Sequence, residues 1–160
     1  MNEKLLRIYL QDHHAGSTTG LELARRAHGN NKGTEYGAAL AKIVDEIAAD
    51  RKALESIMDE LGFGADKVKD LGAWALEKAG RLKLNGQITG YSPLSRLVEL
   101  EGLVTGITGK IALWSALLQI APQEPRLDAA RLERLRESAE SQRTTVEELR
   151  ERAAREAFAG

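Results

Sequence analysis

Cysteine is absent from the 160 residues of this chain. That absence excludes disulfides, thiolate chemistry and metal sites built on cysteine, and it is compatible with a reducing compartment. Proline is scarce: the three prolines all lie at or after Pro93. Since no sustained alternation of apolar and polar residues indicates a strand either, we predict an all-α protein.

An excess of either charge is also missing. Lysine and arginine total 23 and the acidic residues total 24, so the net charge of −1 creates no general attraction to nucleic acid or anionic lipid. Basic residues do not cluster with aromatic residues, as they would in a nucleic-acid-binding surface. The phosphate-binding motifs G-x-x-x-x-G-K-[ST] and G-x-G-x-x-G do not occur. The N-terminus enters an amphipathic pattern without the apolar core of a signal peptide. We therefore expect a cytoplasmic protein without a nucleic-acid or membrane partner.

The most apolar stretch, residues 92–120, is predicted to be the central helix. Ser92 suits an N-cap and Pro93 suits the first helical position. Apolar residues then appear on nearly every side, which is typical of a helix buried on several sides. Charged residues within the stretch argue for burial in protein rather than in lipid: Arg96, Glu99, Glu101 and Lys110. Three glycines at three- and four-residue steps predict a close approach of another backbone: Gly102, Gly106 and Gly109.

The other helices are predicted from their apolar stripes and caps. We expect one domain over residues 1–160, with helices at about 2–28, 35–61, 66–84, 93–120 and 128–158. Four of these helices are about 40 Å long at roughly 1.5 Å per residue. Their matched lengths and short connections predict an up-down bundle, with the shorter helix 66–84 lying in the connection between the second and fourth helices.

The last predicted helix differs from the others in the width of its apolar stripe. Residues 126–160 hold eight arginines, eight acidic residues and no lysine. The apolar seam takes only about two positions in seven, and Gln142 lies within it. We predict that one seam packs against the bundle and that the rest of this helix is solvated.

Polar residues interrupt the apolar stripes near the middle of several helices. The candidates are Asp12 and His13 in the first helix, Glu46 and Asp50 in the second, Glu77 in the third and Glu101 in the fourth. Carboxylates that project inward from facing helices can hold a pair of hard metal ions such as iron or manganese. If a metal binds, the predicted ligands are Asp12, His13, Glu46, Asp50 and Glu101.

With these features the chain resembles the ferritin-like four-helix-bundle superfamily. That resemblance implies a metal site with one carboxylate from each of two helices and a Glu-x-x-His element from each of the other two. No histidine here follows a glutamate by three positions, because Leu10 precedes His13, Gln11 precedes His14 and Arg25 precedes His28. Two stretches resemble bacterial ferritin-like families with incomplete metal sites: Arg81-Leu82-Lys83-Leu84-Asn85-Gly86 and Ser92-Pro93-Leu94-Ser95-Arg96.

Ion pairs are the alternative use of the same carboxylates, and we favour them over metal. Buried acids are usually paired with cations, and Arg51, Lys78, Arg81 and Arg96 are near the candidates in sequence. His13 and His14 point about 100° apart on a helix, so one is expected inside and one outside.

Two functions follow from these alternatives. The first is a non-catalytic ferritin-like bundle that has no cofactor and acts through protein contacts. The second is a carboxylate-bridged iron or manganese protein with oxidase or metal-storage activity. For the first, we predict a homodimer through an apolar face of the central helix, unless helix 66–84 covers that face: Leu100, Leu103, Ile107, Trp114 and Leu117.

Overall fold

The computed structural model describes residues 1–64 and 90–159, which form four long α-helices and one short 3-10 turn. No strand occurs in these residues, so the all-α prediction is confirmed for them. The predicted helix 66–84, with Glu77, lies outside the described part of the chain. The elements are α1 (Glu3–Asn30), α2 (Glu35–Glu60), α4 (Pro93–Ile120), η3 (Ala121–Gln123) and α5 (Ala129–Phe158).

Side-chain caps begin each of the four long helices. The Thr34 hydroxyl accepts a hydrogen bond from Gly37 N at 3.2 Å, and the Ser92 hydroxyl accepts one from Ser95 N at 3.1 Å. Asn2 caps α1 and Asp128 caps α5 in the same way. These bonds satisfy backbone N–H groups that lack a partner within the helix, which is why the predicted starts agree with the structure.

The first helix ends later than the predicted residue 28, because Gly29 and Asn30 still lie within α1. Asn31 takes over the cap: its side-chain amide donates to the Ala27 carbonyl at 2.8 Å. The tight turn that follows brings α2 close, since a Cβ on Gly37 would lie 2.2 Å from the Asn31 carbonyl oxygen. Glycine at position 37 therefore permits the two helices to meet.

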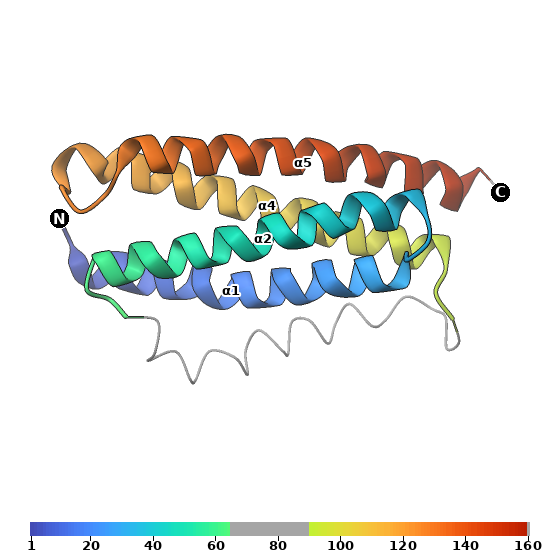
Figure 1. The fold of residues 1–160 in the computed structure, drawn as a ribbon, viewed down its shortest axis with the longest axis horizontal. Coiled ribbons are helices and arrows are strands. Elements are labelled where there is room, and N and C mark those ends of the chain that lie inside the picture. Colours follow the sequence, from blue (N-terminus) through green and yellow to red (C-terminus); the bar gives the residue numbers. More distant parts are fainter. Residues whose placement is uncertain (65–89, 160) are drawn as a thin grey trace.

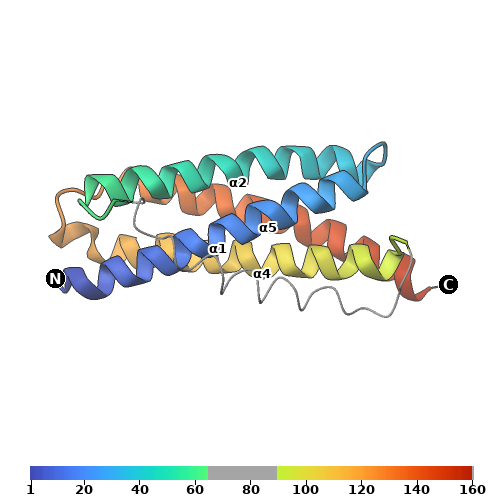
Figure 2. The same ribbon diagram turned by 90° about the horizontal axis from the view of Figure 1, so that it is seen from below.

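The helices pack mainly as two pairs, α1 with α2 and α4 with α5, and α1 also contacts α4 (Figures 1 and 2). Figure 1 shows α1 and α5 running in one direction and α2 and α4 in the other. α2 and α4, which are consecutive long helices of the described residues, are therefore parallel to each other.

At each end of the bundle, one arginine connects several segments of the chain. At one end Arg126 donates to the Leu61 carbonyl at 3.1 Å, to Glu3 at 3.0 Å and to Glu124 at 2.7 Å. The hydrogen bonds from Arg126 lower the pKa of Glu124 to about 2. At the other end Arg96 donates to Asn31 and Glu156, both at 2.7 Å. Each arginine thus joins residues from three parts of the sequence.

The core runs along the inner faces of all four helices, and the narrow seam of α5 is part of it. Ala139, Gln142, Val146 and Ala153 are at most 1% exposed, while Leu135 and Leu149 are partly buried. The prediction that one seam packs is therefore confirmed.

The apolar face assigned to a homodimer is buried within the chain. All five of its side chains are at most 2% exposed: Leu100, Leu103, Ile107, Trp114 and Leu117. These residues therefore do not form a free surface through which a second chain could pack. By length and composition alone, the helical segment Pro93–Gln123 could cross a membrane, with a mean hydropathy of 1.4 in its most apolar window.

Candidate functional site

A buried polar network lies at the middle of the bundle. Lys110 of α4 donates to the Asp50 carboxylate of α2 and to the Gln142 carbonyl of α5, each at 2.5 Å. The Gln142 amide donates to the same Asp50 oxygen at 2.9 Å. Asp50 is 5% exposed and Gln142 1% exposed, so water contributes little to their solvation. The three side chains satisfy one another across three helices.

The apolar stripes of the helices bring these three residues to the same level. Asp50 follows Ile43 and Ile47 on the buried face of α2, and Gln142 occupies a seam position of α5. Burial lowers the pKa of Lys110, and the Asp50 carboxylate opposes that shift. Loss of water disfavours the charged ammonium group, whereas a nearby carboxylate favours it, so the two effects act on the pKa in opposite directions.

A second cluster joins α1 and α2 beside the network. The His14 Nε2 atom lies 2.9 Å from a Glu55 carboxylate oxygen and 3.3 Å from Arg51 Nη2. Arg51 also pairs with Glu55 at 3.1 Å. Because Nε2 carries at most one proton, it either donates to Glu55 or accepts from Arg51. Of the two adjacent histidines, His14 is the buried one, and it lies between Glu55 and Arg51. His13 is half-buried.

The five predicted metal ligands do not gather in the described residues. Asp12 and Glu101 are exposed, and Glu46 pairs with Lys42 at 3.5 Å. Asp50 is held by Lys110, and the His13 ring makes an edge contact with Tyr9 at 4.6 Å between centroids. Burial lowers the pKa of His13. Residues 1–64 and 90–159 contain no group of three histidine or acidic side chains placed to hold one metal ion.

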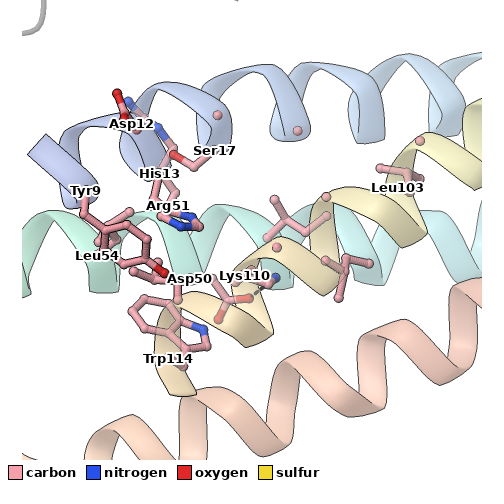
Figure 3. Close-up of a pocket in the computed structure, with 18 residues that line it drawn as sticks. Tyr9, Asp12, His13, Ser17, Asp50, Arg51, Leu54, Leu103, Lys110 and Trp114 are labelled. Carbon is pink, nitrogen blue, oxygen red and sulfur yellow. Dashed lines mark hydrogen bonds and ion pairs between the residues drawn. The ribbon is translucent and has the colours of Figure 1, made fainter. Parts of the chain in front are cut away.

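A cavity of about 450 Å³ lies beside the buried network, between α1, α2 and α4 (Figure 3). Asp50, Lys110 and Arg51 provide its polar wall, and Tyr9 and Trp114 contribute aromatic rings. Glycines occupy much of the remaining wall: Gly16 and Gly20 on α1, and Gly102, Gly106 and Gly109 on α4.

Close approach of another backbone is the role predicted for the glycines on α4. A Cβ added to Gly106 or Gly109 would meet no atom of residues 1–64 or 90–159 within 4 Å, and the same holds for Gly16 and Gly20. Of the five glycines that line the cavity, only Gly102 has a neighbour among the described residues that a Cβ would meet, the Leu23 side chain at 2.9 Å. Among the described residues, therefore, no other backbone closely approaches Gly102, Gly106 or Gly109.

Sequence reasoning missed Lys110 and Gln142 as the partners of Asp50. Two signals were present: Lys110 is a charge within the most apolar helix, and Gln142 interrupts an otherwise apolar seam. Both patterns indicate buried polar groups that require partners. Glu99 was missed as well, although it is buried and accepts hydrogen bonds from Arg26 and Tyr91, both at 2.9 Å.

No model of a known protein family, no curated protein and no solved structure matches this chain.

Proposed function

We propose that this protein is a non-catalytic helical bundle that acts by binding, and that its centre is stabilised by an ion pair instead of a metal. The observation that carries the proposal is the Asp50–Lys110–Gln142 network. It places an ammonium group against the one predicted carboxylate ligand that is fully buried. A cation at 2.5 Å already fills the coordination space that a metal ion would need.

A ferritin-like, up-down organisation is part of this proposal. Ferritin-like bundles join two of their helices by one long crossover. The parallel directions of α2 and α4 in Figure 1 support such a crossover between residues 64 and 90. The predicted helix 66–84 would then be the bundle's fifth, shorter helix, within that connection.

Metal content tests the proposal against its alternative, a di-iron or di-manganese oxidase or storage protein. We expect no stoichiometric metal after expression in medium replete with iron and manganese, because Asp50 is paired and both Glu-x-x-His elements are missing. Elemental analysis of the purified protein is the measurement. About two metal ions per chain, as in a carboxylate-bridged site, would overturn the proposal, and Asp50→Asn should then abolish binding.

Protein contacts remain the proposed mode of action, with a homodimer through α4 as the first candidate. Its five buried residues cannot form that contact, so the proposal moves to exposed positions of the same helix, including Thr105 and Ala112. Only 28% of the most apolar window of α4 is buried, which leaves apolar area for a partner.

Light scattering at micromolar concentration tests self-association. We expect twice the chain mass of 17.5 kDa, and we expect Ala112→Arg to reduce the mass to that of one chain because a charge would enter the contact. A wild-type mass near 17.5 kDa would reject the homodimer. The cytoplasmic location and the absence of nucleic-acid and membrane partners stay predictions.

A further inference from the structure

We infer that the Asp50–Lys110–Gln142 network fixes the register of the bundle, which is the position of the α1–α2 pair along the axis of the α4–α5 pair. Asp50 belongs to the first pair, whereas Lys110 and Gln142 belong to the second. Both hydrogen bonds to the Asp50 carboxylate therefore cross between the pairs. This inference goes beyond the binding role proposed above and does not depend on it.

The buried faces of α2, α4 and α5 share one pattern. Each carries seven positions that alternate steps of three and four residues, and only the fourth position is polar. All the apolar members are buried or partly buried. The stripes, with the C-caps of α2 and α4 included, are Leu40, Ile43, Ile47, Asp50, Leu54, Ile57 and Leu61; Leu100, Leu103, Ile107, Lys110, Trp114, Leu117 and Ala121; and Leu132, Leu135, Ala139, Gln142, Val146, Leu149 and Ala153.

The apolar residues of these stripes fit more than one register. A shift of one helix pair by seven residues corresponds to about 10 Å along the axis and keeps each stripe on the same face. Ile43 or Ile57 would then take the place of Asp50, and both are already core residues. The polar fourth positions distinguish the native register, because a shifted Asp50 would be buried among apolar side chains without Lys110.

Exposed ion pairs also cross between the helix pairs, but their charges regain water when they open. The Arg131–Glu60 pair joins α5 to α2 at 2.8 Å, and both side chains are at least 30% exposed. Ion pairs of this kind contribute little to stability. The Asp50 side chain is 7% exposed, so its charge would stay in the core without hydration. A single buried polar position sets the register of coiled coils for the same reason.

Glu99 of α4 is a second buried acid with partners across the pairs. It accepts hydrogen bonds from Arg26 and Asn30 of α1, at 2.9 and 3.2 Å, and from Tyr91 at 2.9 Å. Tyr91 lies two residues before α4 and would move with it, so Glu99 would keep one donor after a shift. Among the described residues, both donors to the Asp50 side chain lie on the other pair. The central network is therefore the contact that opposes a shift most strongly.

Distances between two spin labels measure the register. The chain has no cysteine, so labels attach only to cysteines introduced in place of Lys42 and Arg134, which are exposed on α2 and α5. These positions lie eight residues before Asp50 and Gln142, on helices that run in opposite directions, and thus on opposite sides of the network (Figure 1). Double electron–electron resonance gives the distance, and an excess of unlabelled protein suppresses distances between chains. We expect one narrow distance in the labelled protein with the network intact.

Removal of the network should permit other registers. In the triple variant Asp50→Leu, Lys110→Met and Gln142→Leu, we expect the helical circular dichroism signal to persist. A second label distance should appear, and the axial shift behind it should be about 10 Å, the length of one heptad.

The matched control makes three apolar substitutions seven residues away from the network: Ile43→Leu, Leu103→Met and Leu149→Met. Apolar exchanges of similar volume are tolerated in a core, so this variant should keep the single distance.

The other possible results contradict the inference. A single wild-type distance in the folded triple variant would show that the apolar stripes fix the register by themselves. An unfolded triple variant would show that the network is required for folding and does not merely select a register. Two distances in the control, or with the network intact, would show that register does not depend on the network.

Discussion

Replacement of Lys110 by methionine should lower the free energy of unfolding by about 3–5 kcal/mol. The substitution removes the cation and leaves the Asp50 carboxylate, which is 5% exposed, with only the Gln142 amide as a partner. An uncompensated buried charge is among the most destabilising defects a single substitution can create. Denaturant unfolding followed by circular dichroism measures the effect.

A variant that removes the whole network is the control for Lys110→Met. In this triple variant, Asp50 and Gln142 are replaced by leucine in addition to Lys110→Met. The site of the network then contains no charge and no unpaired amide. Networks of this kind can often be replaced by apolar residues of similar volume at no cost or with a gain. We therefore expect the triple variant to recover most of the lost stability. If Lys110→Met alone melts like the wild type, the network is solvated and does not organise the centre of the bundle.

Leu103→Asp should unfold the protein at room temperature. Leu103 is 2% exposed in the middle of α4, so the new carboxylate would lose its hydration in the core without a cation placed to meet it. The expected cost of several kcal/mol is comparable with a total stability of about 5–15 kcal/mol. Val104→Asp should cost less, because Val104 is only partly buried.

Leu94→Asp is the matched control on the same helix. Leu94 is 42% exposed and lies in the first turn of α4, where a negative charge interacts favourably with the helix dipole. We expect this variant to be as stable as the wild type or slightly more stable. Circular dichroism during heating distinguishes the two variants. A wild-type melting curve for Leu103→Asp would show that the core along α4 is packed differently.

The sequence by itself determined the four long helices of the described residues, and their ends, with little error. Ser92 and Pro93 begin α4 at the predicted residue, and Thr34 caps α2 as expected. Caps and stops depend on hydrogen bonds between residues three to five positions apart, so the information lies in the local sequence. The late end of α1 shows the limit of such signals, because α1 continues past residue 28 to Asn30 and is capped by Asn31.

The narrow seam of α5 was also determined by the sequence. The seam consists of seven positions spaced by three and four residues: Leu132, Leu135, Ala139, Gln142, Val146, Leu149 and Ala153. Residues with this spacing lie on one side of a helix and can therefore face one partner. Burial of Ala139, Val146 and Ala153 follows from that geometry without knowledge of the partner. The spacing could not show that Gln142, in the same seam, would meet Asp50 of α2.

Only the tertiary structure decided how the mid-helix polar residues are used. Asp50 had an arginine next to it in sequence, but its partners are Lys110 and Gln142, which lie 60 and 92 residues away. The rotation and level of each helix result from packing all the apolar stripes at once, so no single segment contains that information. The same packing placed glycines of α1 and α4 along a cavity, which their spacing in the sequence could not show.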